Sequence, residues 1–290
     1  MGKDTLFIPL TFIKNIMKFG DKTYIMGIIN VNSDSFYEGS RCPSLAEAVE
    51  KAKKMIGEGV DIIDVGAEST RPGSSYLEPN LETERIIPVI KALSKLGVKI
   101  SVDTYKSSVA RKALEAGACF INDVSGGKYD SRMLPLAAEF NVPIILMHNP
   151  LKKGELPHVS KDYLPYSDVV GEVVEDLKRI SEKAVSSGIS PENIILDPGI
   201  GFRKSTEDNI LLIRNLALIK ELGFPVLVGA SNKRFIGEIL GIEDASKRLE
   251  GTLAVTTLSI MQGADIIRVH EVAPNVKVAR MTDEIVRKRL

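Results

Sequence analysis

Polar side chains that could do chemistry stand at the ends of short apolar runs along this sequence. The run "DIIRVH" ends with Arg268 and His270, and the run "NIILD" ends with Asp197. The full set of such run ends is Asn30, Asp64, Asp103, Asn122, Asp123, His148, Asp197, Gly229, Ser231, Arg268 and His270. Each of these alone could be a helix cap or a turn residue, because Asn, Asp and Ser favour those positions. The alternation of Arg268 with His270, and the acid or amide at most run ends, favours a binding site.

The acids and the amide of this set suit a flat heterocyclic ligand. Asp103, Asn122 and Asp197 supply two carboxylates and one amide group. A carboxylate can accept two parallel hydrogen bonds from the N–H groups of an amino-substituted ring. These residues therefore predict a ligand with several N–H donors and a carbonyl.

A second group of residues suits an anion. Arginine binds phosphate oxygens with two donors, which makes Arg268, beside His270, a candidate phosphate ligand. An asparagine oxygen such as that of Asn30 can ligate a hard cation, for example Mg²⁺. Lys233, which follows the run "PVLVG", adds a further cation. The sequence therefore predicts a phosphate group beside the heterocycle.

The runs alternate with longer amphipathic stretches, and this alternation predicts the fold. Nearly continuous apolar runs are typical of parallel strands that are covered on both faces. Eight of them occur: "YIMGIIN", "DIIDVG", "KISVD", "CFIND", "PIILMH", "NIILD", "PVLVG" and "DIIRVH". Helical spacing follows the runs, as in "SLAEAVEKAKKMIGEG" and "NILLIRNLALIKELG", and these stretches end at glycine.

Eight strand–helix pairs predict an α/β fold of one domain, a (β/α)8 TIM barrel over residues 24–290. Residues 1–23 are predicted to be an N-terminal extension that caps the barrel. An open sheet with a nucleotide site would carry G-x-G-x-x-G after its first strand, and this sequence does not. The carboxyl ends of barrel strands converge on one face, so we expect the run-end residues to meet there.

Composition limits the partners and the compartment. The 38 basic and 38 acidic residues balance, and the basic ones are dispersed, so we expect no nucleic-acid partner. No apolar stretch approaches the ~20 residues that span a bilayer, so we expect no membrane association. Cys42 and Cys119 are far apart and have no metal-ligand spacing, which favours a reducing, cytoplasmic compartment.

Three local alternatives fit the sequence less well. A zinc site made of His148, His158 and His270 lacks any recognised ligand spacing. A serine nucleophile at Ser231 lacks the G-x-S-x-G elbow. The stretch "ESTRPGSSY" could be an ordinary Pro-Gly turn, but its place after the second strand and its Arg71 favour a mobile lid.

Seven motifs, taken in order, resemble those of a known family. They are "MGIINVNSDSFYEG", "DVGAESTRPGS", "SVDTYKSSVA", "INDVSGG", "DPGIGFRK", "GASNKRFIG" and "RVHEV". Between Met26 and Val272 this chain is therefore similar to the dihydropteroate synthase family, the pterin-binding barrels of the folate pathway. The resemblance implies condensation of a pterin methyl diphosphate with p-aminobenzoate and release of diphosphate.

The resemblance also implies a role for each matched residue. The pterin ring would be bound by Asp103, Asn122, Asp197 and Lys233, in a pocket lined by Met147 and Phe202. The diphosphate, where the chemistry takes place, would be bound by Asn30, Arg268 and His270. Mg²⁺ would lie on Asn30, and a homodimer would form through barrel helices. Two mobile loops that close over p-aminobenzoate would contain Phe36, Thr70 and Arg71.

The chain departs from the family pattern at a few positions. The family commonly has Thr-Pro at Asn32 and Ser33, arginine at Asn232 and aspartate at Glu271. Arg234 replaces a serine of many members, and we expect it to bind the anionic group of the aromatic amine.

Several alternatives stay open at this stage. A methyltetrahydrofolate-dependent methyltransferase uses a similar barrel but needs no diphosphate site. A non-catalytic pterin-binding paralogue is a second alternative, because of Asn232 and the altered first loop at Asn32 and Ser33. The same condensation could use the ribosylated aminobenzene phosphate of methanopterin synthesis. Arg268 could instead be structural and pair with an acid such as Glu271.

Overall fold

Eight parallel strands form the centre of the molecule. The computed structural model describes residues 17–31, 45–68, 74–151, 155–157 and 163–288. In this part of the chain the strands lie in the spatial order β6-β5-β4-β3-β2-β1-β8-β7. Their bounds are Tyr24–Asn30 (β1), Ile62–Gly66 (β2), Lys99–Asp103 (β3), Phe120–Asp123 (β4), Ile144–Met147 (β5), Ile194–Asp197 (β6), Leu227–Val228 (β7) and Ile266–Val269 (β8).

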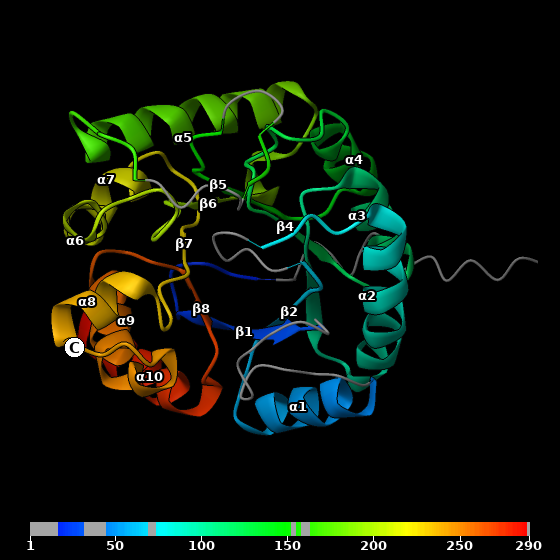
Figure 1. Cartoon of the computed structure of the whole chain (residues 1–290), viewed down its shortest axis with the longest axis horizontal. Helices are drawn as coiled ribbons and strands as arrows, with labels where there is room; N and C mark the ends of the chain where they lie inside the picture. Colours follow the sequence, from blue (N-terminus) through cyan, green and yellow to red (C-terminus); the bar gives the residue numbers. More distant parts are fainter. Residues whose placement is uncertain (1–16, 32–44, 69–73, 152–154, 158–162, 289–290) are drawn as a thin grey trace, which may run out of the picture.

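The two outer strands of that order meet and close the sheet. A parallel bridge joins Leu196 of β6 to Val226, and the Leu196 amide donates to the carbonyl of Pro225 at 2.9 Å. Figure 1 shows the helices arranged around the strands. The predicted (β/α)8 barrel is therefore confirmed.

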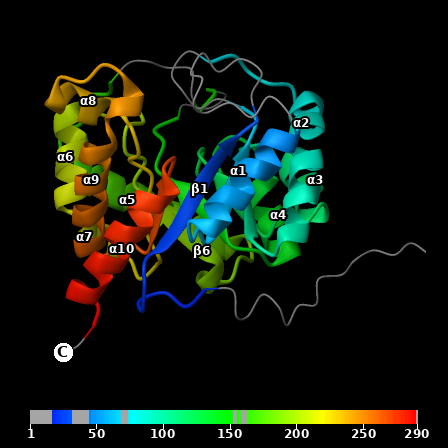
Figure 2. The same ribbon diagram turned by 90° about the horizontal axis from the view of Figure 1, so that it is seen from below.

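Helices follow the strands and cover the outside of the barrel. Their bounds are Leu45–Gly57 (α1), Pro79–Leu93 (α2), Ser107–Glu115 (α3), Met133–Phe140 (α4), Val169–Ser186 (α5), Thr206–Arg214 (α6), Leu216–Lys220 (α7), Arg234–Leu240 (α8), Leu249–Met261 (α9) and Val272–Val286 (α10). Short 3-10 turns lie at Ser94–Leu96 (η2), Pro191–Asn193 (η3) and Ala245–Lys247 (η4). Figure 2 shows β1 running toward the end of the barrel at which α8 lies.

One predicted helix is divided in the structure. The pattern over residues 209–223 predicts a single helix, whereas α6 and α7 are separated at Asn215. The side-chain amide of Asn215 donates to the carbonyl of Leu211 at 2.8 Å. Such a local side-chain bond competes with the helical pattern and accounts for the break.

A layer of apolar side chains inside the barrel determines which residues reach its mouth. The layer contains Tyr24, Met26, Ile62, Phe120, Ile145, Ile195, Leu227 and Ile266. Alternate residues of a strand point to the same face, so residues two positions further along also point inward. These residues include Asp64, Asn122, Met147, Asp197, Gly229 and Arg268. The period of two thus delivers the predicted polar residues to the carboxyl-terminal end of the barrel.

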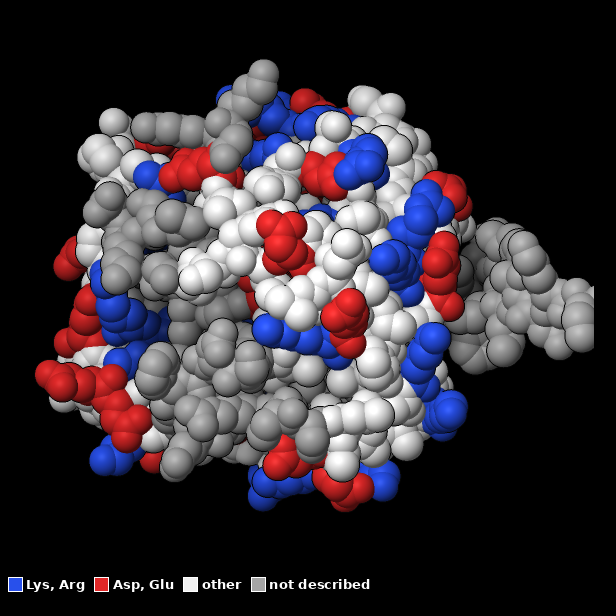
Figure 3. Space-filling model, turned by 45° about the vertical axis from the view of Figure 1, so that its right-hand side comes forward, with Lys and Arg blue, Asp and Glu red and all other residues white. Residues whose placement is uncertain are grey.

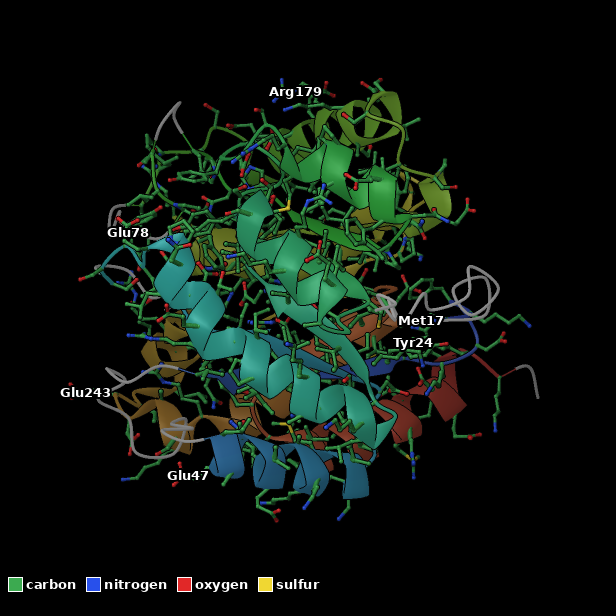
Figure 4. All side chains as sticks on the ribbon, turned by 90° about the vertical axis from the view of Figure 1, so that its right-hand side faces the viewer. Met17, Tyr24, Glu47, Glu78, Arg179 and Glu243 are labelled. Carbon is green, nitrogen blue, oxygen red and sulfur yellow. The ribbon has the colours of Figure 1, made fainter. Side chains whose placement is uncertain are left out.

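The described part of the N-terminal extension lies at the opposite end. Met17 and Phe19 pack against the apolar layer, and the Phe19 ring meets the Tyr24 ring edge-on at 5.7 Å. Figure 4 shows Met17 and Tyr24 at the end of the barrel away from Glu78 and Glu243. Residues 1–16 are outside the described part, so the predicted cap over residues 1–23 stays a prediction.

The surface has mixed charge on the face shown in Figure 3, where Lys and Arg side chains are interspersed with Asp and Glu. Among the described residues, no helix has the length and apolar character needed to cross a membrane.

Candidate functional site

Arg268 joins two carboxylates at the carboxyl-terminal mouth of the barrel. Its Nε donates to Oδ2 of Asp64, and its Nη2 donates to Oδ2 of Asp103, both at 2.6 Å. Asp64 is fully buried and Asp103 nearly so. The acids that pair with Arg268 are therefore Asp64 and Asp103, whereas Glu271 bonds elsewhere. No described residue accepts from Nη1 of Arg268, so this edge of the guanidinium can meet a ligand.

Asp103 and Asn122 are register partners on β3 and β4. The Asn122 Nδ2 donates to Oδ2 of Asp64 at 2.9 Å, so both residues share contacts with the Arg268 network. Burial raises the pKa of Asp103 to about 7, although the positive charge of Arg268 lowers it. A ligand N–H that bonds to this carboxylate would stabilise its ionised form.

Asp197 ends β6, and the turn that follows it directs its carboxylate. The Gly199 amide donates to Oδ1 of Asp197 at 2.7 Å. Gly199 has a φ of 67°, and an added Cβ would lie 2.1 Å from the carbonyl oxygen of His148, so only glycine fits. Burial raises the pKa of Asp197, and the charge of Lys233 lowers it. Burial also lowers the pKa of Lys233, to about 8.

Apolar side chains lie beside these groups. Met147 is the register partner of Asp197 and is buried in a cluster with Tyr105, against which Phe202 packs. The Lys233 Nζ lies 4.6 Å from the centroid of the Phe202 ring, which is a cation–π contact. The structure therefore brings together the predicted pocket residues Met147 and Phe202 with two of the predicted polar ligands.

The residues predicted to bind diphosphate lie on β1 and β8, which pair in parallel. Asn30 ends β1, and its side-chain amide makes no hydrogen bond with a described residue. Arg268 lies within β8, and His270 follows that strand directly. The Nδ1 of His270 lies 3.0 Å from the Oγ of Ser231, which orients the imidazole ring. Three potential anion ligands thus belong to two adjacent strands.

Two of the departures from the family pattern are in direct contact. The Nδ2 of Asn232 donates to both carboxylate oxygens of Glu271, at 3.1 and 3.3 Å. Asn232 has a φ of 58°, in the left-handed region that asparagine tolerates better than most residues. Arg248 Nη1 also donates to the Asn232 carbonyl at 3.0 Å. These contacts hold the turn that carries Lys233.

The contacts of Arg234 within the described residues are with Glu238 and Tyr163 rather than with the strand ends. Arg234 is the first residue of α8 and is exposed. Its Nε lies 3.0 Å from Oε1 of Glu238, and its guanidinium lies 4.6 Å from the centroid of the Tyr163 ring. The assignment of Arg234 to the aromatic amine stays a prediction.

Several predictions concern residues outside the described part of the chain. They include the loop residues Phe36, Thr70 and Arg71, the departures Asn32 and Ser33, and His158 of the zinc alternative. Among the described residues, no group of three or more His, Cys, Asp or Glu side chains is placed to hold a metal ion.

Two buried residues at the mouth have no role predicted from the sequence. Asp64 is one of the run ends. Like Asp197, it lies two residues after an apolar residue that points into the barrel, and this spacing is the sequence signal that places it in the site. Lys204 is 1% exposed and donates to Nδ1 of His148 at 2.9 Å. Its sequence neighbours in "GFRKS" resemble an ordinary polar loop, so no local signal indicates its burial.

Comparison with known proteins identifies the family. A family model described as "Pterin binding enzyme" matches residues 26–270 of this chain. The chain belongs to the pterin-binding enzymes. The dihydropteroate synthase of Bacillus subtilis (strain 168) is 45% identical over 273 residues, which are 94% of this chain and 92% of that protein. The predicted family is confirmed.

Solved structures of pterin-binding enzymes also match. The dihydropteroate synthase of Clostridium difficile, solved in the presence of pteroic acid, has a TM-score of 0.86 and 43% identity. The match covers 94% of this chain and all of the other. The dihydropteroate synthase of Xanthomonas albilineans with 4-aminobenzoic acid has a TM-score of 0.84 and 38% identity, over 93% and 95% of the two chains.

Proposed function

We propose that this chain is a dihydropteroate synthase. It condenses 6-hydroxymethyl-7,8-dihydropterin diphosphate with p-aminobenzoate and gives 7,8-dihydropteroate and diphosphate, so it is a transferase of the pterinylmethyl group. The observation that carries the proposal is that Asp103, Asn122 and Asp197 lie with Arg268 at one barrel mouth. Arg268 pairs with Asp103, Asn122 donates to the Asp64 that Arg268 also contacts, and the charge of Arg268 lowers the pKa of Asp197. Relatives at 45%, 43% and 38% identity carry this name, and the latter two were solved with pteroic acid and with 4-aminobenzoic acid, respectively.

The pterin would bind among the strand ends of β3, β4 and β6. The carboxylates of Asp103 and Asp197 accept hydrogen bonds from the ring N–H groups, and Asn122 adds an amide. Lys233, whose charge lowers the pKa of Asp197, supplies a cationic donor. Met147 and Phe202 supply apolar contact for the ring, as their shared cluster supports.

The diphosphate would bind where β1 and β8 meet. Arg268 would contribute its Nη1, which donates to no residue in the described part of the chain, and His270, held by Ser231, would contribute its imidazole. The side-chain oxygen of Asn30 accepts from no residue in the described part of the chain, and it suits a hard cation. Mg²⁺ usually takes one or two protein ligands and fills its shell with phosphate oxygens and water, so a single Asn30 ligand fits. When bound, this ion would neutralise charge on the diphosphate.

The reaction needs charge stabilisation more than proton transfer. As the bond from the pterin methylene to the diphosphate oxygen breaks, negative charge grows on the leaving group and positive charge on the pterin. Arg268 and His270 stabilise the first, and the carboxylates of Asp103 and Asp197 stabilise the second. The p-aminobenzoate nitrogen then bonds to the methylene and loses a proton. Aromatic amines are weakly basic, so the lone pair is already free and no residue is assigned as a general base.

The named relatives favour this reaction over the alternatives. They are synthases, whereas a methyltransferase would have no need of the Arg268 and His270 pair beside Asn30. Binding of p-aminobenzoate, with Phe36, Thr70 and Arg71 in two closing loops, is carried over from the family. Arg234 is proposed to bind the anionic group of the amine, because it lies at the start of α8, immediately after Lys233.

A homodimer is proposed on the helices α8 to α10, which lie side by side in Figure 1. These helices carry several exposed apolar residues: Ile239, Leu240, Leu258, Met261, Met281 and Ile285. The helix α9 carries apolar residues on most of its sides, which is typical of a buried helix. A second copy of the chain would cover this surface symmetrically. We place the enzyme in the cytoplasm, where the free thiol of Cys119 stays reduced.

One experiment tests the proposed reaction and its second substrate. The purified protein is mixed with the pterin diphosphate and either p-aminobenzoate or the ribosylated aminobenzene phosphate. We expect diphosphate release with p-aminobenzoate and a product with the mass of dihydropteroate. Calorimetric binding of pterin without diphosphate release would indicate the non-catalytic paralogue. Release with the phosphate-bearing amine alone would keep the reaction class and overturn the substrate.

A further inference from the structure

A buried lysine beside the proposed pterin site has no part in the reaction described above. Lys204 follows the turn after β6 and is almost completely buried. Its Nζ donates to Nδ1 of His148 at 2.9 Å, to the Gly199 carbonyl at 3.0 Å and to the Phe202 carbonyl at 3.2 Å. A lysine ammonium has three N–H donors, so all of them are used.

These contacts define the state of His148. Its Nδ1 accepts from Lys204, so a ring proton must be on Nε2, which lies 3.7 Å from Oδ2 of Asp176 on α5. Burial lowers the pKa of His148 to about 2, and the charge of Lys204 acts in the same direction. The imidazole is therefore a neutral acceptor for Lys204, and its Nε2 lies near Asp176 of α5.

The same contacts hold the turn that directs Asp197. Gly199 gives its amide hydrogen to Asp197 and its carbonyl to Lys204, so the lysine fixes the residue that orients the carboxylate. The Phe202 carbonyl is fixed by the same ammonium, and the Phe202 ring packs against the cluster that includes Met147. One side chain thus holds both a polar and an apolar part of the pterin site.

Charge connects Lys204 to the site as well. Burial lowers the pKa of Lys204 to about 7, whereas Asp197 and Asp208 raise it and Lys233 and Lys128 lower it. In return, Lys204 lowers the pKa of Asp197, together with the larger effect of Lys233 and that of Arg268. No carboxylate bonds directly to the Lys204 ammonium within the described residues, so its charge acts on Asp197 through space.

We propose that Lys204 is a positioning residue for the pterin site. It holds the turn from Gly199 to Phe202 against His148, and its charge favours the ionised Asp197 that the pterin N–H groups require. This inference rests on the proposed pterin binding. Loss of the Lys204 side chain should therefore weaken binding of the pterin and leave binding of the aromatic amine unchanged.

The variant Lys204→Met tests this directly. We expect the Kd for the pterin to rise by about tenfold to a hundredfold, as for loss of hydrogen bonds from a charged group. The KM for the aromatic amine should stay unchanged. At low pH pterin affinity is lost when Asp197 takes up a proton, and the variant should move this loss of affinity, the acid limb, to higher pH, because the charge of Lys204 no longer lowers the pKa of Asp197. A purely structural lysine would leave the limb in place.

A control separates the effect on pterin binding from a loss of stability. Lys220 likewise donates to a buried group, but that group is the carboxylate of Asp265, at 2.5 Å, at the amino-terminal end of the barrel. Lys220→Met should lower the melting temperature without changing the acid limb of pterin affinity.

A second pair of variants serves if Lys204→Met fails to fold. His148→Asn keeps an oxygen acceptor near the position of Nδ1, and His148→Leu does not. The Asn variant should retain most of the pterin affinity that the Leu variant loses. Equal pterin affinity in this pair, or a folded Lys204→Met protein with wild-type affinity and acid limb, would overturn the role of Lys204. Failure of the wild type to bind pterin would instead overturn the proposed function, and the inference with it.

Discussion

Removal of the Arg268 side chain should destabilise the protein strongly, because Arg268 compensates two buried carboxylates. Its Nε and Nη2 lie 2.6 Å from Asp64 and Asp103, and only 18% of its side chain is exposed. Loss of one partner from a buried ion pair typically costs ~3–5 kcal/mol, since a charge is left without compensation. We therefore expect Arg268→Ala to lose ~3–5 kcal/mol of unfolding free energy at pH 9. The retained contact from Asn122 to Asp64 should limit the loss to this range.

The loss should depend on pH in a defined direction. The pKa of Asp103 is raised to about 7 in the fold, and without Arg268 it should rise further. A folded state with a raised acid pKa binds more protons than the unfolded state, so it loses stability as pH rises through that range. At pH 6 Asp103 holds its proton with or without Arg268, so the cost of the substitution is smaller there. Each further unit of pKa shift adds ~1.4 kcal/mol to the difference between the two pH values.

Urea unfolding at pH 6 and pH 9, followed by circular dichroism, measures this difference. Arg111→Ala is a matched control, because Arg111 also pairs with a carboxylate, that of Glu139 at 2.5 Å, but on the surface. Surface pairs contribute little, so the control should unfold like the wild type at both pH values. Arg268→Ala should also weaken binding of the pterin diphosphate far more than binding of the free pterin. A fully stable variant at pH 9, or equal losses at both pH values, would refute this account of the pair.

Four further changes test other parts of the site. Asp197→Asn should weaken pterin binding by ~2–5 kcal/mol in calorimetry, since it presents a donor to the ring N–H groups; unchanged affinity would remove Asp197 from the site. Arg234→Ala should raise the KM for p-aminobenzoate and leave pterin binding unchanged; equal amine kinetics would make Arg234 a surface residue. Pterin affinity should fall as pH rises through about 7 and about 8, where Lys204 and then Lys233 lose their protons, and Lys233→Met should lack the second of these losses. Met261→Asp on α9 should give a monomer in analytical ultracentrifugation, whereas a persistent dimer would exclude this surface.

Much of the fold can be predicted from local sequence pattern. Continuous apolar runs separated by helical spacing predict the strands within one or two residues, because both faces of a barrel strand are buried. The shortest strand, β7, covers only Leu227–Val228 of the predicted run over residues 225–229. The break at Asn215 is less predictable, since it depends on a single side-chain bond inside a well-formed helical pattern.

The candidate site is predictable in its members but not in their pairing. The period of two places Asp64, Asp197 and Arg268 at one mouth, and the sequence already marks them as polar ends of apolar runs. The choice of Asp64 and Asp103 as partners of Arg268 joins residues from β8, β2 and β3, which spacing alone does not specify. The burial of Lys204 likewise depends on how the turn folds back at Gly199, where φ is positive.

The most direct test of the central claim is a crystal structure of the wild-type protein with the pterin diphosphate in the absence of an amine. We expect the ring N–H groups within hydrogen-bond distance of Asp103 and Asp197, with the diphosphate at Arg268 and His270. A pterin bound away from the strand ends, or a diphosphate that contacts neither Arg268 nor His270, would contradict the account.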